Sequence, residues 1–194
     1  GSIGWQHHTS LLQNISLHMN AKDRIALCGD NGCGKSTLIK AILNNSEVIK
    51  TGHWMMPKPM NIGYLDQHYA TLDPEKTVLD TLSLLVPYWP FIKVRKHLND
   101  FLFRKNEEIN VKTSQLSGGE KVRLCLAQIA ACPPQLLILD EITNNLDLET
   151  KKHVIQVLQD YPGAMLLICH EDDFLNQLEI TRCYHILNNS LIQN

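Results

Sequence analysis

The stretch GDNGCGKS at residues 29–36 constrains this chain more than any other feature of its sequence. It matches the pattern G-x-x-x-x-G-K-[ST], in which glycines allow backbone amides to wrap around phosphate oxygens. The run RIALC before it (24–28) predicts a short buried strand, and the apolar spacing from 36 to 43 predicts a helix after it. A strand, a glycine loop and a helix in this order predict an α/β nucleotide-binding fold.

The residues of this loop have distinct expected roles toward a nucleoside triphosphate. Lys35 is expected to reach the β- and γ-phosphates, and the Ser36 hydroxyl is expected to coordinate Mg²⁺. The amides at the start of the following helix add a positive field. The loop residues expected to bind the nucleotide are Gly29, Asp30, Asn31, Gly32, Cys33, Gly34, Lys35, Ser36 and Thr37.

Two adjacent carboxylates, Asp140 and Glu141, follow the apolar run QLLIL at 135–139. Charged groups at the end of a buried strand are costly unless something uses them. In phosphate-loop folds an acid at the end of a neighbouring strand holds Mg²⁺, which is the role expected for Asp140. Glu141, one residue further on, is then placed to accept a proton from a water that attacks the γ-phosphate.

The rest of the chain alternates between predicted strands and predicted helices. Strands are predicted at 11–19, 61–67 and 164–169, and a helix at 151–160. Apolar residues at helical spacing predict a helical insertion over about 77–131. Near the end, Asn188-Asn189 between two apolar runs predicts a tight hairpin turn.

The stretch LSGGEK at 116–121 has two compatible interpretations. Ser117 and Glu120 form an S-x-x-E capping box for a following helix. Gly118 and Gly119 fall in the first turn of that helix, where each costs roughly 1 kcal/mol relative to alanine. A cap alone does not need them, whereas bare amides at a helix N-terminus suit an anion.

LSGGE resembles the signature of ATP-binding-cassette (ABC) domains, and with GDNGCGKS before it and LDE after it the resemblance covers nearly the whole chain. It implies a P-loop NTPase (RecA-like) core sheet, an antiparallel β subdomain and an α-helical signature subdomain. We therefore expect one nucleotide-binding domain over 1–194. Its α/β core would span about 1–74 and 133–194, and its helical subdomain about 75–132.

The resemblance also implies roles for residues outside the phosphate loop. Gln67 is similar to the glutamine that senses Mg²⁺ and water, and His170 to the switch histidine that contacts the γ-phosphate. Asp147 resembles the aspartate of the D-loop, and Trp5 stands where the family places an aromatic residue that stacks on adenine. The signature residues expected to contact a nucleotide are Ser117, Gly118, Gly119 and Glu120.

One subfamily is indicated by the segment LDEITNNLD, which is close to LDEPTNHLD of the F subfamily. Those proteins are soluble ATPases with two cassettes, and several act on ribosomes. Ile142 replaces the proline of that pattern and Asn145 the histidine, so the loop geometry is expected to differ. The short segment between Gln67 and Leu116 resembles the second cassette. Because so little precedes Trp5, the chain is expected to be a fragment of a longer protein.

The function implied by the resemblance is binding and hydrolysis of ATP with Mg²⁺. Two cassettes, in the same chain or in a homodimer, close head-to-tail around two ATP molecules, so an isolated cassette is expected to be slow. The full-length protein is expected to act on the ribosome. The alternatives are the ATPase subunit of a membrane transporter and a nucleotide-gated interaction module that needs no hydrolysis; an intact Glu141 speaks against the last.

Charge and cysteine content add broader limits. The net charge of −2 gives no general attraction to nucleic acid or anionic membranes, and no apolar run is long enough to cross a bilayer. The six cysteines form no C-x-x-C pair. They are interpreted as buried free thiols of a reducing, cytoplasmic compartment, with a zinc site as the alternative.

Overall fold

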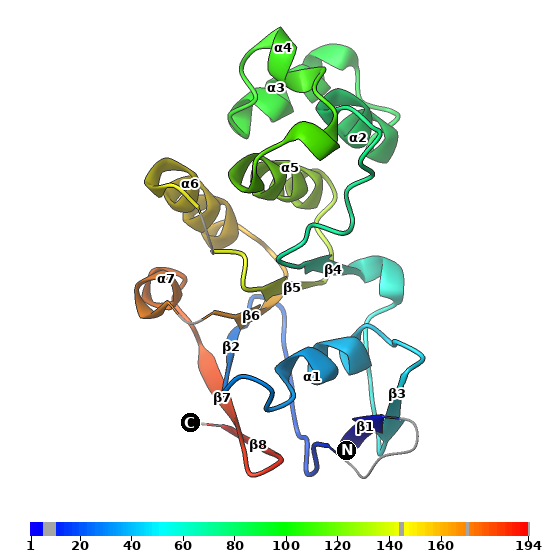
Figure 1. Cartoon of the computed structure of the whole chain (residues 1–194), viewed down its shortest axis with the longest axis vertical. Coiled ribbons are helices and arrows are strands. Elements are labelled where there is room, and N and C mark those ends of the chain that lie inside the picture. Colours follow the sequence, from blue (N-terminus) through cyan, green and yellow to red (C-terminus); the bar gives the residue numbers. More distant parts are fainter. Residues whose placement is uncertain (6–10, 144–145, 170, 194) are drawn as a thin grey trace. The chain divides into compact units, whose positions relative to one another are not determined.

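The computed structural model describes residues 1–5, 11–143, 146–169 and 171–193. The chain forms two compact units. The sheet unit comprises Gly1–Tyr64, Pro134–Glu141 and Pro162–Asn194, and the helical unit comprises Leu65–Pro133 and Ile142–Tyr161 (Figure 1). The expected boundaries place residues 65–74 and the helix predicted at 151–160 in the α/β core. In the structure both segments belong to the helical unit.

The strands are β1 (Ser2–Trp5), β2 (Arg24–Cys28), β3 (Val48–Thr51), β4 (Ile62–Leu65), β5 (Leu136–Asp140), β6 (Ala164–Ile168), β7 (Arg182–Leu187) and β8 (Ser190–Gln193). The helices are α1 (Lys35–Ile42), α2 (Val78–Leu85), α3 (Phe91–Asp100), α4 (Asn106–Ile109), α5 (Gly118–Ala131), α6 (Leu148–Gln159) and α7 (Asp172–Gln177). Short 3₁₀ turns occur at Pro59–Asn61 and Thr113–Gln115.

The main sheet has the strand order β4-β5-β6-β2-β7-β8. Strands β5, β6, β2 and β7 run parallel to one another, and β8 returns antiparallel to β7. The predicted strands at 24–28, 61–67, 135–139 and 164–169 are confirmed as β2, β4, β5 and β6. This parallel-rich α/β sheet confirms the predicted fold class.

The predicted hairpin at the end of the chain is also confirmed. Asn188 and Asn189 connect β7 to β8 with φ values of 47° and 59°. Positive φ at both central residues suits the two-residue turns whose twist matches antiparallel strands, and asparagine tolerates this conformation better than most residues.

The core of the sheet unit lies between the main sheet and α1. Ile25 and Leu27 of β2 point to the same face of the sheet, and they belong to one buried cluster with Leu38 and Ile39 of α1. All four side chains are at most 2% exposed. This packing anchors the helix at the end of β2, so it also holds the loop between the two elements.

The predicted strand at 11–19 is wrong. Leu12 forms only an isolated antiparallel bridge with Ile3, and Gln13 only a parallel bridge with Ser190. Asn14 then adopts a φ of 52°, which extended strands exclude, so the pairing is interrupted there and resumes only with Ile15, whose N–H donates to the Gly1 carbonyl at 2.9 Å. The partner of β1 is instead β3, which pairs antiparallel with it and which the sequence did not predict.

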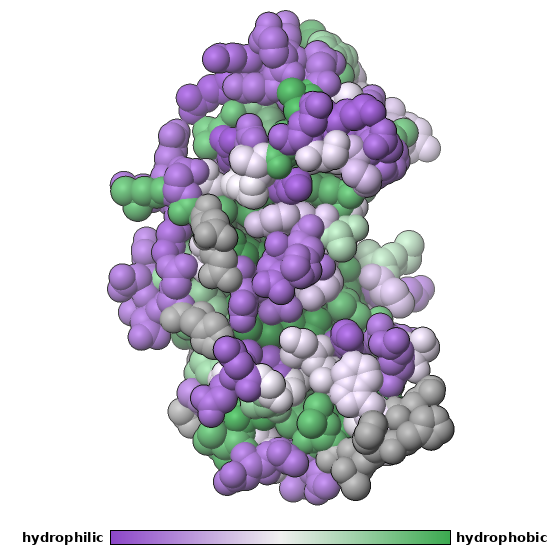
Figure 2. All heavy atoms as spheres, in the orientation of Figure 1, coloured by the Kyte–Doolittle hydropathy of each residue, from purple (hydrophilic) through white to green (hydrophobic). Residues whose placement is uncertain are grey.

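The helical unit confirms the predicted helical insertion. Val78 and Leu82 are fully buried in α2, and Leu98 is fully buried in α3. Several large apolar side chains remain exposed, among them Tyr88 and Ile92. On the face drawn in Figure 2, apolar residues (green) occur in separate groups among polar ones (purple). Within the described ranges, no helix is both long and apolar enough to span a membrane.

Candidate nucleotide site

The loop between β2 and α1 has a backbone that requires glycine. Gly29, Gly32 and Gly34 have φ values of 145°, 79° and 115°, a region that other residues rarely adopt. A Cβ atom on Gly29 would lie 2.7 Å from Cys33 Sγ, and one on Gly34 would lie 3.3 Å from the Leu12 side chain. The loop is therefore closely packed at Gly29 and Gly34, whereas Gly32 is required by its φ alone.

Lys35 folds back over the loop that precedes it. Its Nζ donates hydrogen bonds to the carbonyl oxygens of Gly29, at 2.6 Å, and Asp30, at 3.0 Å. The residue is only 7% exposed. An ammonium group has three donors, of which these two contacts use two. The cation is thus held at the inner side of the loop, where it can meet a phosphate oxygen.

Helix α1 begins directly behind the loop without a capping side chain. Its N-cap is Gly34, in the left-handed conformation, and this residue has no side chain with which to cap the first turn. The first amides of a helix have no partner within the helix, so they suit an anion. They border a hollow of about 170 Å³ whose lining residues are Asn31, Gly32, Gly34, Lys35, Ser36, Thr37 and Glu141.

The acid pair lies at the C-terminal end of β5. Asp140 is the last residue of this strand, in register with Ile168 of β6. Glu141 donates its backbone N–H to the Ile168 carbonyl at 2.9 Å and has a φ of 54°. A non-glycine residue in this region carries strain on the order of 1–3 kcal/mol, which is common at functional sites. The turn directs Glu141 into the hollow beside Lys35 and Ser36.

Tyr64 is a site residue that sequence reasoning missed. Its hydroxyl donates a hydrogen bond of 3.1 Å to Asp140 Oδ2. The two residues meet because β4 lies beside β5 in the sheet. The only signal in the sequence was the position of Tyr64 in the strand before Gln67, and that signal does not specify a partner.

The signature residues belong to the helical unit, where the predicted capping box is confirmed. The Ser117 hydroxyl accepts a hydrogen bond from Glu120 N at 3.3 Å, and Glu120 Oε2 accepts one from Ser117 N at 2.8 Å. A Cβ on Gly118 would have its nearest neighbour at 3.9 Å, and one on Gly119 at 3.6 Å. Packing within the chain therefore does not require glycine at either position.

Asp147 and Gln67 also lie in the helical unit. Asp147 is the N-cap of α6, where its carboxylate accepts hydrogen bonds from Thr150 N at 2.9 Å and Thr150 Oγ1 at 2.7 Å. These hydrogen bonds lower the pKa of Asp147. Gln67 is exposed, with its Nε2 3.4 Å from His68 Nε2.

A further predicted site residue, the expected adenine-stacking aromatic, belongs to the sheet unit. Trp5 ends β1, and Lys40 Nζ lies 4.9 Å from the centre of its ring, a cation–π distance. The ring is half-buried against the core of the sheet unit. His170 lies outside the described residues, as does Asn145.

The parallel sheet, the glycine loop and the acidic strand end define a P-loop ATPase. Its sequence agrees, because the family model described as ABC transporter matches residues 12–144. The chain belongs to the ABC transporter family and is an ATPase domain of its F type.

Curated relatives support this assignment. The chain is 39% identical to ATP-binding protein Uup of Haemophilus influenzae, over 90% of this chain and 27% of that protein. It is 38% identical to Uup of Escherichia coli, over 90% of this chain and 28% of that protein. It is 34% identical to ABC transporter F family member 5 of Arabidopsis thaliana, over 87% of this chain and 24% of that protein. The chain thus spans about a quarter of the length of these relatives.

Proposed function

We propose that this chain is one ATP-binding cassette, which binds ATP with Mg²⁺, hydrolyses it with Glu141 as the base and closes head-to-tail with a second cassette. The observation that carries the proposal is the position of Glu141, which lines the same hollow as Lys35, Ser36 and Thr37. A phosphate site and a carboxylate that face the same space suit attack of a water on a bound phosphate.

The residues around the hollow fit both ATP and Mg²⁺. Lys35 and the first amides of α1 supply positive charge and donors for the phosphates. The Ser36 hydroxyl and the Asp140 carboxylate are oxygen ligands of the kind that Mg²⁺ prefers. When bound, Mg²⁺ neutralises charge on the phosphate oxygens. Tyr64 orients Asp140 for this role through its hydrogen bond.

The proposed division of labour follows from the chain's own groups. Glu141 accepts the proton of the attacking water, while Lys35 holds the phosphates in place. Gln67 and His170 are assigned to the water and the γ-phosphate by the family resemblance, and Trp5 to adenine. Asp147 keeps the start of α6 in place, because both of its hydrogen bonds to Thr150 cap that helix.

The signature glycines support a second cassette as partner. Gly118 and Gly119 have room for a Cβ within their own chain, yet glycine occupies both positions in the first turn of α5. Their cost to the helix is then explained by close approach of another molecule to the bare amides. We assign the nucleotide of a second cassette to this position, whether in the same chain or in a second copy. An isolated cassette should therefore turn over more slowly than roughly 10 per second, a typical enzyme rate.

For the whole protein we propose a role on the ribosome in the cytoplasm, with this chain as the second cassette of a longer polypeptide. The support is the similarity of LDEITNNLD to the F-subfamily pattern and the match to an F family member. The second candidate is the ATPase subunit of a membrane transporter, which the name of the matching family favours. Co-sedimentation of the full-length protein with ribosomes in the presence of ATP separates the two.

The test of the site compares wild type with Glu141→Gln in Mg-ATP, measuring hydrolysis, nucleotide retention and particle mass by light scattering. The variant should hydrolyse ATP on the order of 10²–10⁴ times more slowly, because it lacks the base. It should also retain ATP and dimerise. Glu47→Gln, at an exposed position, should match wild type. Equal hydrolysis by wild type and Glu141→Gln would exclude Glu141 as the base.

A further inference from the structure

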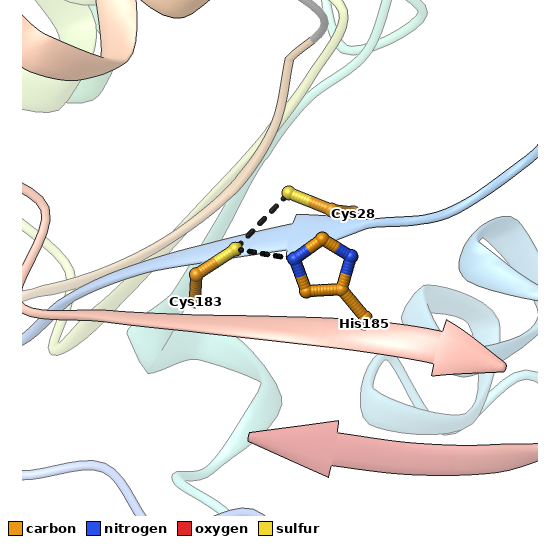
Figure 3. Close-up of side chains that lie close together, drawn as sticks. All are labelled: Cys28, Cys183 and His185. Atoms are coloured by element: carbon orange, nitrogen blue, oxygen red, sulfur yellow. Dashed lines mark hydrogen bonds between the residues drawn. The ribbon is translucent and has the colours of Figure 1, made fainter. Parts of the chain in front are cut away.

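Three metal-ligating side chains cluster on the sheet unit, directly behind the phosphate loop. Cys28 Sγ lies 3.2 Å from Cys183 Sγ, and Cys183 Sγ lies 3.3 Å from His185 Nε2. All three ligand atoms lie within 4.8 Å of one another. Figure 3 shows the three side chains converging from β2 and β7. The nucleotide site described above uses none of them.

The strand register explains why these residues meet. Cys28 is the direct cross-strand neighbour of His185, and Cys183 is the neighbour of Ala26. Residues two apart in a strand point to the same face, so Cys183 and His185 share the face to which Cys28 also points. The opposite face of β7 carries Tyr184 and Ile186, which belong to the buried core. The trio is therefore grouped by the sheet itself and not by a mobile loop.

Each side chain of the trio is half-buried. An ion from solvent can therefore reach the ligand atoms, while the surrounding sheet limits how far they spread. The six cysteines are free thiols, as predicted, but only Cys125 and Cys169 are buried. Cys28, Cys33 and Cys183 are half-buried, and Cys132 is exposed. The alternative of a zinc site thus gains a specific location.

We propose that Cys28, Cys183 and His185 form a binding site for a thiophilic metal ion of the Zn²⁺ class. Two thiolates and one imidazole are the soft and borderline ligands that such ions select. With Zn–S bonds near 2.3 Å, two sulfurs in a tetrahedral site lie about 3.8 Å apart, so the sulfurs need to separate by only about half an ångström. Three protein ligands leave the fourth position for water.

The charges balance at this site. Binding of Zn²⁺ displaces one proton from each thiol, and the neutral imidazole donates a nitrogen lone pair, so the two thiolates cancel the charge of the ion. Burial and the neighbouring Cys183 thiol raise the pKa of Cys28 to about 12, so in the free protein this sulfur is protonated and the ion must displace its proton.

A disulfide between Cys28 and Cys183 is the obvious competing outcome, and backbone geometry disfavours it. The two residues are diagonal neighbours on adjacent parallel strands, with Cys183 opposite Ala26. Given the spacing and rise of strands, their Cα atoms lie roughly 8 Å apart. Disulfides require Cα atoms within about 7 Å, so a bond here needs movement of the central sheet. A metal ion bridges the same sulfurs without it.

The experiment measures binding of Zn²⁺ and of Co²⁺, its spectroscopic substitute, to the reduced protein without nucleotide. Wild type should bind one ion per chain, and Co²⁺ should produce a sulfur-to-metal charge-transfer band. Cys183→Ser and His185→Gln should each weaken binding at least tenfold, and Cys183→Ser should also diminish the band. Cys132→Ser, which changes an exposed cysteine of the helical unit, should bind like wild type.

Each variant is first checked for cooperative unfolding, which shows that it is folded. It is also checked for binding of Mg-ATP, which is assigned to other residues. His185→Gln keeps the test valid even if Cys183→Ser does not fold. The proposal is overturned if wild type binds no ion, or if the folded variants bind it as tightly as wild type. Mass spectrometry of the air-exposed protein tests for the competing disulfide. A Cys28–Cys183 disulfide in a protein that takes up no metal also overturns the proposal.

Discussion

The Tyr64 hydroxyl donates its hydrogen bond to Oδ2 of Asp140 across two neighbouring strands of the sheet, at 3.1 Å. A carboxylate proposed to hold Mg²⁺ is thus itself held in place by a phenol from β4. Groups that orient a metal ligand in this way typically contribute ten- to a hundredfold to metal affinity.

Tyr64→Phe should therefore raise the Mg²⁺ concentration needed for half-maximal ATP hydrolysis by about tenfold. The ring and its packing remain, so the stability of the fold should change little. The measurement is a Mg²⁺ titration of hydrolysis at saturating ATP. Tyr88→Phe is the control, because Tyr88 is 96% exposed. An unchanged Mg²⁺ dependence in Tyr64→Phe would show that Asp140 does not depend on the Tyr64 hydroxyl for its orientation.

Gly34→Ala should destabilise the chain more than Gly32→Ala. Both residues have positive φ, but a Cβ on Gly34 meets Leu12 at 3.3 Å, whereas one on Gly32 meets no atom of the described residues within 4 Å. Backbone strain alone should lower the free energy of unfolding by about 1–2 kcal/mol at Gly32, with additional crowding at Gly34. Denaturant unfolding of both variants measures the difference. Equal losses would mean that Leu12 moves aside at no cost.

Ser117→Ala should lower the free energy of unfolding by about 1 kcal/mol, because it removes the N-cap of α5. Ser117→Asn restores a capping oxygen and should recover this stability, but it should not recover ATP-driven closure with a second cassette if the hydroxyl contacts the partner's nucleotide. Unfolding measures the first effect, and light scattering in Mg-ATP, with each change made in the Glu141→Gln background, measures the second.

The matched control for Ser117 is Thr77→Ala, which removes the capping box of α2 in the same unit. It should cost a similar free energy of unfolding and leave closure unchanged. If Ser117→Asn closes as well as wild type, Ser117 is only a helix cap.

His153 predicts a pH dependence of stability. Burial, and then the charge of Arg123, lower its pKa below the ordinary value of 6.5. Between that value and the lower folded pKa, the unfolded chain binds more protons than the folded chain, so stability falls as the pH falls through this window. His153→Gln should flatten this part of the curve of unfolding free energy against pH. The exposed His53→Gln should leave it unchanged, and an identical slope in His153→Gln would contradict the prediction.

Several elements could be predicted because their signals are local. The glycine loop depends on φ values that glycine alone adopts easily, and the Asn188-Asn189 turn depends on the same kind of preference. The capping box of Ser117 and Glu120 lies within one helical turn. In each case the residues that act together lie within a few positions of one another, so the sequence pattern contains the interaction.

The errors occurred where pairing across the chain decides the outcome. Residues 11–19 alternate like a strand, yet Gln13 N donates to the Asn189 carbonyl, and the positive φ of Asn14 interrupts the pairing with the start of the chain. Strand β3 carries no strong pattern of its own and forms because β1 offers it an antiparallel partner. Strand propensity depends strongly on such neighbours, which a single sequence does not reveal.

The sequence by itself determined the class of this protein, because phosphate binding needs glycines, a lysine and a hydroxyl at short, invariant spacing. Only the tertiary structure decided which distant residues support that site. The strand order brings Tyr64 to Asp140, and the register of β2 with β7 brings Cys28 to Cys183 and His185. These pairs join residues far apart along the chain, and their contact exists only once the buried faces of the strands have fixed the order and register of the sheet.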